Sequence, residues 1–197
     1  MNYINEFYSK FKPLLTSASY KPGQFHRWPA FEFIAEELFK KNRPLKIIET
    51  GCHRGENWLG YGHSTVLWDY IISKTGGEVY SCDIDSEAIK FARSKCEKVK
   101  FVNCDSIGFL RTCDAENLDF LYLDSYDWSR EKHVSSCLHH MGELAAIYDR
   151  LPKGCLIAVD DAHSQTEGKH VLVHQFFDKI LNQNPIVSCH TIVWRKN

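Results

Sequence analysis

The sequence predicts an α/β protein with a doubly wound, mostly parallel sheet, helices on both faces and an antiparallel C-terminal edge strand. First, five short, β-rich runs are almost continuously apolar, which is typical of strands buried on both faces. Second, helical patterns separate these runs, and this alternation gives parallel strands with right-handed crossovers. Third, acidic residues close the runs, at the sheet edge where open α/β folds bind ligands. Together these observations indicate a Rossmann-like fold.

The elements follow from the same patterns in chain order. The apolar runs predict strands at residues 45–50, 77–85, 98–105, 118–125 and 155–161. Helical periodicity between them predicts helices at residues 64–75, 86–96, 106–112 and 133–151. Residues 170–182 then predict a further helix, and residues 186–196 a final strand, antiparallel at the sheet edge.

The chain is expected to form one domain around one core, because it has 197 residues of which 44% are hydrophobic. Residues 1–44 predict two helices, one of them the amphipathic segment AFEFIAEELFKK, which pack on or cover the site. Residues 45–197 carry the sheet and the ligand-binding residues.

Charge and composition limit the possible partners and the compartment. Lys plus Arg total 24 against 25 for Asp plus Glu, so no basic field points to a nucleic acid. No apolar run is long enough to span a bilayer, and the N-terminus lacks the apolar core of a signal peptide. The eight cysteines form no C-x-x-C pair and are expected to be reduced core thiols. We therefore expect a soluble cytoplasmic protein with a small-molecule partner and no membrane partner.

A glycine-rich loop, ETGCHRGENWLGYGHST, follows the first strand and precedes a helix. Glycines there let backbone approach a ligand closely, and Ser64 is placed to cap the helix. The dinucleotide pattern G-x-G-x-x-G does not occur, and Glu49 would repel a diphosphate. Its charge suits a cationic ligand instead. Other acids close the later strands: Asp83, Asp85, Asp105, Asp124, Asp160 and Asp161.

These residues resemble the class I S-adenosylmethionine-dependent methyltransferases over roughly residues 45–195. Glu49-Thr50-Gly51 looks like the first motif of the family, Asp83 its ribose-binding acid and Asp105-Ser106 its adenine contact. The resemblance implies S-adenosylmethionine as cofactor. The cofactor-binding residues it implies here are Glu49, Gly51, Gly62, Ser64, Asp83, Asp105, Ser106 and Asp124.

Two segments, LYLDSYDW and LIAVDDAH, are similar to the metal-dependent O-methyltransferases of the catechol and macrocin types. The resemblance implies Asp124, Asp160 and Asp161 as ligands of Mg²⁺ or Mn²⁺. Three carboxylates suit such a hard, octahedral ion better than zinc. The implied activity is methylation of a hydroxyl on a sugar or phenolic small molecule.

Catalytic roles are expected for Asp124, Asp127 and His163. Asp124 could be both metal ligand and proton acceptor. Asp127 stands where catechol-type enzymes carry a lysine, which favours the sugar-methylating macrocin type. His163 follows Asp161 by two residues, on the loop expected to face the substrate.

Several alternatives stay open at this point. A methyltransferase without metal, an NAD-dependent oxidoreductase and a binding module without turnover would each fit such a sheet. A two-His-one-carboxylate iron site could be assembled from the histidines. His139 and His140 precede Glu143 by one helical turn and are expected to pair with it. A homo-oligomer is possible.

Overall fold

The computed structural model describes residues 3–16, 26–56 and 63–197. Its seven-stranded sheet has the order β3-β2-β1-β4-β5-β7-β6. The strands are β1 (Leu45–Thr50), β2 (Gly77–Asp83), β3 (Val99–Asn103), β4 (Phe120–Leu123), β5 (Leu156–Val159), β6 (Val187–Ser188) and β7 (Ile192–Arg195). β1 to β5 pair in parallel, whereas β7 is antiparallel to β5 and to β6. The predicted fold class is confirmed.

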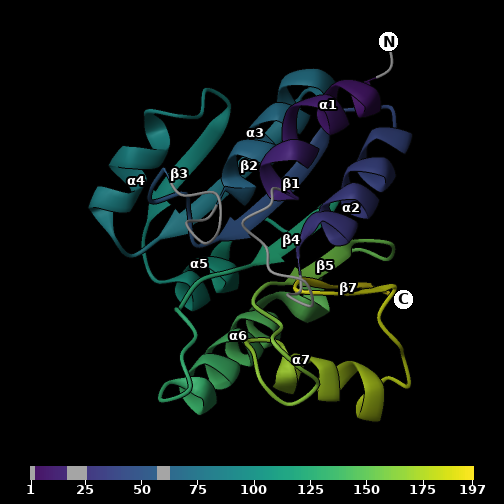
Figure 1. Cartoon of the computed structure of the whole chain (residues 1–197). Helices are drawn as coiled ribbons and strands as arrows, with labels where there is room; N and C mark the ends of the chain where they lie inside the picture. The colour runs from purple at the N-terminus through teal and green to yellow at the C-terminus, as the bar shows by residue number, and fades with distance from the viewer. Residues whose placement is uncertain (1–2, 17–25, 57–62) are drawn as a thin grey trace.

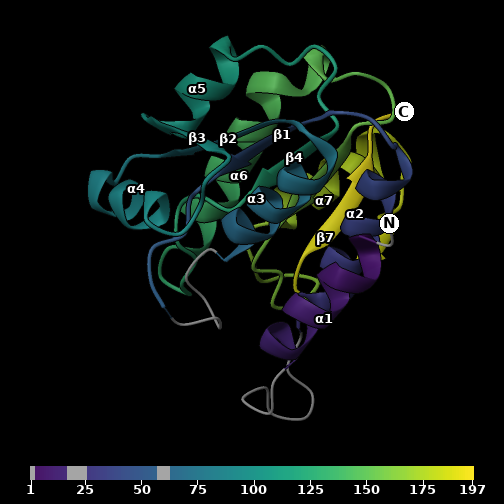
Figure 2. The same ribbon diagram turned by 90° about the horizontal axis from the view of Figure 1, so that it is seen from above.

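Helices α1, α2 and α3 cover one face of the sheet, and α5, α6 and α7 cover the other (Figure 1). On the first face lie α1 (Tyr3–Leu15), α2 (Trp28–Lys40) and α3 (Ser64–Thr75). On the second face lie α5 (Ser106–Thr112), α6 (His133–Ile147) and α7 (Val171–Gln175). Helix α4 (Ser86–Arg93) packs against β2 and β3, and Figure 2 shows it at the end of the sheet opposite α1.

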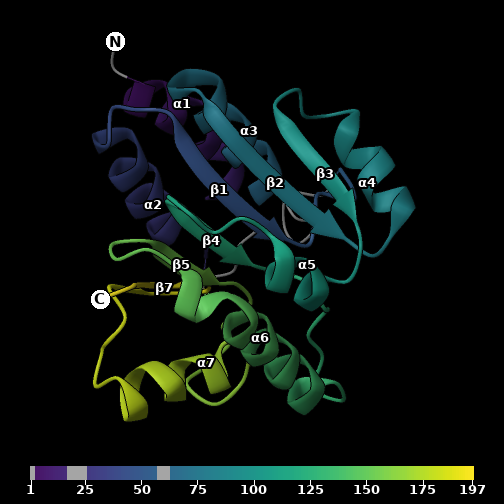
Figure 3. The ribbon, with the colours of Figure 1, turned by 180° about the vertical axis from the view of Figure 1, so that it is seen from behind.

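Alternation along the strands divides the core into these two layers. Ile47 of β1 faces α2 and α3, while its neighbour Ile48 packs with the helices of the other face. Phe120 and Leu121 repeat this alternation in β4. Figure 3 shows the second layer, with α5 and α6 beside β4 and β5. Because both faces are covered, the central strands are almost entirely apolar, as in the sequence pattern.

The C-terminal part differs in detail from the expectation. The predicted last strand is a hairpin of β6 and β7, so the two-residue β6 forms the edge and β7 lies inside it. The predicted helix at residues 170–182 is α7 followed by a π-helical turn, Phe176–Ile180. Helix α6 ends at Ile147, and a 3₁₀ turn, Tyr148–Arg150, completes the predicted segment. Among the described helices, none combines the length and the apolar character that a bilayer span requires.

Candidate functional site

A cavity of about 510 Å³ opens at the carboxyl ends of the parallel strands, which is a typical volume for a small-molecule site. Its wall includes residues that follow five successive strands and residues from the N-terminal segment. These are Gly51, Cys52, Asp83, Ile84, Asp85, Cys104, Asp105, Ser106, Asp124, Ser125, Tyr126, Asp127, Asp160 and Asp161, with Leu15, Arg27 and Phe31. The sheet therefore gathers the predicted strand-end acids at one site, with the exception of Glu49.

Glycine is required at position 51, directly after β1, because the backbone there lies against the backbone that follows β4. Its φ of +79° belongs to the left-handed region, and a Cβ there would lie 2.6 Å from the Asp124 carbonyl oxygen. Its N–H donates to the Cys82 carbonyl at 2.8 Å. The backbone after β1 is thus fixed at the cavity wall without a side chain in the way.

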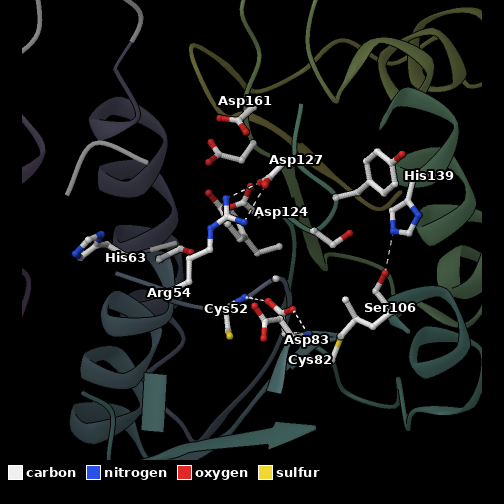
Figure 4. Close-up of a pocket in the computed structure, with 18 of the residues that line it drawn as sticks. Cys52, Arg54, His63, Cys82, Asp83, Ser106, Asp124, Asp127, His139 and Asp161 are labelled. Carbon is white, nitrogen blue, oxygen red and sulfur yellow. Dashed lines mark hydrogen bonds and ion pairs between the residues drawn. The ribbon is translucent and has the colours of Figure 1, made fainter. Parts of the chain in front are cut away.

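Asp83 lies at the end of β2 and organises the loop after β1. Its carboxylate accepts the backbone N–H of Cys52 at 3.0 Å and that of Asp85 at 2.8 Å (Figure 4). Because the same carboxylate also faces the cavity, it is placed to accept hydrogen bonds from ligand hydroxyls.

Asp105 and Ser106 sit at the start of α5. Asp105 accepts the N–H of Gly108 at 2.7 Å and caps the helix. The Ser106 hydroxyl lies 3.0 Å from Nε2 of His139 (Figure 4). The ring of His139 in turn stacks on Tyr126, with centroids 5.2 Å apart. This end of the cavity is therefore partly aromatic.

Behind His139, a buried carboxylate fixes the arrangement. Glu143 is fully buried, accepts the Ser125 hydroxyl at 2.6 Å, and lies 3.6 Å from Nε2 of His139. His140 Nε2 lies 3.8 Å from Glu143 Oε2 without a hydrogen bond, so the expected contact with Glu143 is closer at His139. Burial alone would raise the pKa of Glu143, but His139, His140 and the serine hydroxyls outweigh it and lower the pKa to about 2.

Glu49 is placed differently from the expectation. It is completely buried beneath the cavity rather than at its wall. Four donors bind it: Ser64 Oγ at 2.6 Å, Thr65 Oγ1 at 2.7 Å, Ser81 Oγ at 2.7 Å and Trp68 Nε1 at 2.9 Å. Burial raises its pKa to about 7, and these hydrogen bonds offset only part of that effect. Glu49 therefore ties α3 to β1 and β2, and its contact with a cofactor stays a prediction.

Ser64 lines the cavity, but its predicted capping role needs a correction. It is the first residue of α3 and its hydroxyl donates to Glu49, whereas the N-cap position belongs to His63. Gly62, together with the aromatic residues Trp58 and Tyr61 of the same loop, lies outside the described residues.

Asp124, Asp160 and Asp161 converge as predicted, but two cations bind them. Arg27 donates from Nε to Asp160 Oδ2 at 2.6 Å and from Nη2 to Asp161 Oδ1 at 2.7 Å. Nζ of Lys169 lies 2.6 Å from Asp124 Oδ1 and 3.0 Å from Asp161 Oδ2. Lys169 is only 1% exposed. A buried lysine of this kind is held charged by its carboxylate neighbours, which raise its pKa despite its burial.

Asp124 and Asp161 have pKa values that are shifted in opposite directions. Burial raises the pKa of Asp124 to about 8, an effect that Lys169 opposes and Asp160 and Asp161 reinforce. Asp161 behaves in the opposite way, because Lys169, His190 and Arg27 together overcome its burial and hold its pKa well below the usual range. Asp161 is therefore ionised at neutral pH, and Asp124 titrates closer to neutrality.

The three acids as arranged do not fit a magnesium ion. Thr191 donates to Asp160 Oδ1 at 2.6 Å, and His190 Nε2 lies 3.1 Å from Asp161 Oδ1. Of the carboxylate oxygens, only Asp124 Oδ2 lacks a partner among the described residues. Mg²⁺ needs several oxygens in octahedral geometry, and Lys169 already bridges two of the acids.

Asp161, His163 and His190 form a second candidate ligand set, with one atom from each within 4.8 Å of the others. Imidazole and carboxylate suit transition metals. Both oxygens of Asp161, however, already contact Arg27 or Lys169, which repel a further cation. The ring of His163 packs on Trp128 at 4.0 Å between centroids, and the residue is not part of the cavity wall.

Asp127 lies at the cavity wall and pairs with Arg54, which belongs to the loop after β1 (Figure 4). The contact is bidentate, with Arg54 Nη1 at 3.0 Å from Asp127 Oδ2. These hydrogen bonds lower the pKa of Asp127, so it is an anion at neutral pH. Arg54, like Arg27 and Lys169, carries no sequence signal that would have marked it as a site residue.

Comparisons with known proteins support the fold. No family model and no curated protein matches the chain. Among solved structures, MycE methyltransferase from the mycinamycin biosynthetic pathway, in complex with Mg, SAH and mycinamycin VI, has a TM-score of 0.59 at 14% identity, covering 98% of this chain and 54% of that one. The O-methyltransferase NovP has a TM-score of 0.55 at 14% identity, covering 87% and 79%.

A putative rRNA methylase from Clostridium thermocellum has a TM-score of 0.54 at 16% identity, covering 84% of this chain and 93% of that one. The chain therefore spans about half the length of MycE and most of the length of the other two. At these identities the likeness shows a shared Rossmann-like fold.

Proposed function

We propose that the chain is an S-adenosylmethionine-dependent methyltransferase that methylates a hydroxyl of a sugar or phenolic small molecule. One observation carries the proposal: the residues after five successive strands, including Gly51, Asp83 and Asp124, line a single cavity of suitable volume. The similar folds of MycE, crystallised with SAH, and of NovP support this choice.

The residues of the cavity wall between Gly51 and His139 would hold the cofactor. The Asp83 carboxylate would accept hydrogen bonds from the ribose hydroxyls, and the backbone at Gly51 would lie beside the amino acid moiety. Tyr126, His139 and Ser106 surround the base. When bound, the sulfonium cofactor supplies an activated methyl group.

The acceptor lies toward Asp124, Asp127 and Arg27 on the same wall. Oδ2 of Asp124 accepts no hydrogen bond from the described part of the chain, and its raised pKa of about 8 suits a proton acceptor near neutral pH. Asp124 therefore takes the proton that the acceptor hydroxyl loses as its oxygen gains the methyl group. Asp127, an anion paired with Arg54, helps to orient the acceptor.

Several arguments favour a small acceptor over a nucleic acid. The cavity wall carries Asp83, Asp85, Asp105, Asp124, Asp127, Asp160 and Asp161 against two arginines, Arg27 and Arg54. Asp83, Asp85 and Asp105 have no cationic partner among the described residues, and their charges repel a phosphate backbone. The net charge of -1 gives no compensating basic field. A cytoplasmic location and a homo-oligomeric state remain predictions.

Other functions fit the site less well. An NAD-dependent oxidoreductase would need a diphosphate close to the loop after β1, which lacks G-x-G-x-x-G and is followed by acids at the cavity wall. Magnesium is not part of the proposal, although the MycE complex contains it, because Arg27 and Lys169 already bind the acids that would hold it.

The test is transfer of a labelled methyl group from S-adenosylmethionine to a panel of sugars, phenols and total RNA. We expect label only in hydroxylated small molecules, with transfer strongly reduced in Asp124→Asn. Exposed Glu87→Gln serves as the matched control, because Glu87 lies on α4 outside the cavity. Label in RNA alone would contradict the acceptor class, and absence of S-adenosylhomocysteine binding would contradict the cofactor.

A further inference from the structure

We infer that Lys169 and Arg27 take the place of a divalent metal at the strand-end acids, so that the site works with two built-in cations. The inference rests on the proposed function, because it concerns the acids beside the proposed acceptor position. It also explains why the three predicted metal ligands lie close together while most of their carboxylate oxygens are bound by protein cations.

Lys169 occupies the position of a bridging cation. Its Nζ contacts Asp124 Oδ1 at 2.6 Å, Asp161 Oδ2 at 3.0 Å and the Asp124 carbonyl oxygen at 3.3 Å. These three oxygens come from the ends of two neighbouring strands, β4 and β5, which is where a metal ion between the strands would bind. A buried ammonium and a divalent ion cannot share this place without strong repulsion.

The backbone conformation at Gly168 and Lys169 places the Lys169 side chain between Asp124 and Asp161. Gly168 has a φ of +136°, and a Cβ at that residue would lie 2.4 Å from the Asp161 carbonyl oxygen. Ala162 and Gly168 form an isolated antiparallel bridge, and the Lys169 N–H donates to the Asp161 carbonyl at 3.2 Å. The loop after β5 therefore folds back on Asp161 and fixes Lys169 behind the acids.

Arg27 completes the arrangement from the N-terminal segment. Its guanidinium holds both Asp160 and Asp161 and also lines the cavity. The described residues accept hydrogen bonds from Nε and Nη2 of Arg27 only, so Nη1 is able to donate to an acceptor oxygen. Arg27 would thereby fix the acceptor, a task that metal-dependent enzymes give to the ion.

The two side-chain cations supply the same positive charge as a divalent metal ion. Three carboxylates carry up to three negative charges, and Lys169 with Arg27 supply two positive ones, the same as one divalent ion. His190 and Thr191 satisfy two of the remaining acceptor positions by hydrogen bonding. The three carboxylates are therefore stabilised by Lys169 and Arg27 without a divalent cation.

The test is a titration with Mn²⁺ alone, followed by electron paramagnetic resonance, on the full chain. Wild-type protein, Lys169→Met, Arg27→Met and the exposed control Lys90→Met are compared. We expect no stoichiometric Mn²⁺ binding by the wild type or Lys90→Met. Lys169→Met should bind one Mn²⁺ at least about tenfold more tightly than the wild type, because acids surround the position that the lysine ammonium leaves.

Two results of the Mn²⁺ titration would contradict the inference. One tightly bound Mn²⁺ in the wild type would overturn the inference, and so would equal binding in wild type and both cation variants. Arg27→Met keeps the test informative if Lys169→Met does not fold. S-adenosylhomocysteine binding is measured by calorimetry on the same samples, so a failure of the cofactor assignment is recorded independently of the metal result.

Discussion

Gly51 and Asp124 meet backbone to backbone, so closely that a Cβ on Gly51 would lie 2.6 Å from the Asp124 carbonyl oxygen. This contact joins the loop proposed to hold the cofactor to the acid proposed to face the acceptor. It fixes the distance between the two halves of the proposed site.

Gly51→Ala should therefore lower both the stability and the affinity for S-adenosylhomocysteine, the latter at least about tenfold, because the backbone must move to relieve the clash. Gly76→Ala is the matched control, since Gly76 has a similar φ of +74° but open space around it. It should cost roughly 1–3 kcal/mol of stability from its backbone conformation alone, with φ 74° and ψ 178°, and leave the affinity unchanged. Thermal unfolding and calorimetry measure the two effects. Equal affinities in both variants would show that the close approach is irrelevant to binding.

Asp83→Asn should weaken S-adenosylhomocysteine binding roughly tenfold to a hundredfold, because a charge-assisted hydrogen bond contributes about 1.5–3 kcal/mol. The amide can also no longer accept both backbone N–H groups, from Cys52 and Asp85. Glu87→Gln, on the exposed surface of α4, should bind like the wild type. Calorimetric dissociation constants decide the matter, and unchanged affinity in Asp83→Asn would remove Asp83 from the site.

Glu143→Gln should lower the free energy of unfolding by about 3 kcal/mol at pH 7, since its pKa falls from 4.5 to about 2 on folding. The folded protein keeps this carboxylate ionised where the unfolded chain already binds a proton. The stabilisation is therefore complete above pH 4.5 and is lost as the pH falls toward 2. Urea unfolding of both proteins from pH 7 to 3 should show the difference shrinking. A difference that is independent of pH would contradict the ionised, hydrogen-bonded carboxylate.

Arg54→Met should change the stability by less than about 1 kcal/mol, because its pair with Asp127 is substantially exposed. It should nevertheless raise the pKa of Asp127 and alter the pH profile of methyl transfer. The matched variant Lys95→Met removes another exposed ion pair, with Glu56, and should leave that profile unchanged. Identical pH profiles for wild type and Arg54→Met would exclude Asp127 from acceptor handling.

The sequence pattern was sufficient to predict the sheet and the acids at its edge. The central strands are buried on both faces, so hydrophobicity alone marks where they end. Asp83 is the last residue of β2, and Asp124 and Asp160 directly follow β4 and β5. It was not sufficient for Glu49, an acid near the end of β1 that the sequence alone does not distinguish from the acids of the cavity wall. Only the folded chain shows that Ser64, Thr65, Trp68 and Ser81 enclose it.

Arg27 and Lys169 were not predicted as site residues for a different reason. Arg27 precedes Asp160 by 133 residues, and Lys169 follows Asp124 by 45, so no local spacing connects them. The pattern D-D at a strand end is the same whether a metal or a side-chain cation neutralises it. The metal prediction depended on this ambiguity, and the positions of Arg27 and Lys169 now weigh against it.

The most direct measurement of the central claim is a calorimetric titration of the purified chain with S-adenosylhomocysteine, with NAD and the Asp83→Asn variant as controls. We predict binding at one site with a micromolar dissociation constant, weaker binding by the variant and no heat with NAD. Absence of S-adenosylhomocysteine binding, or binding of NAD in its place, would contradict the assignment of the cavity.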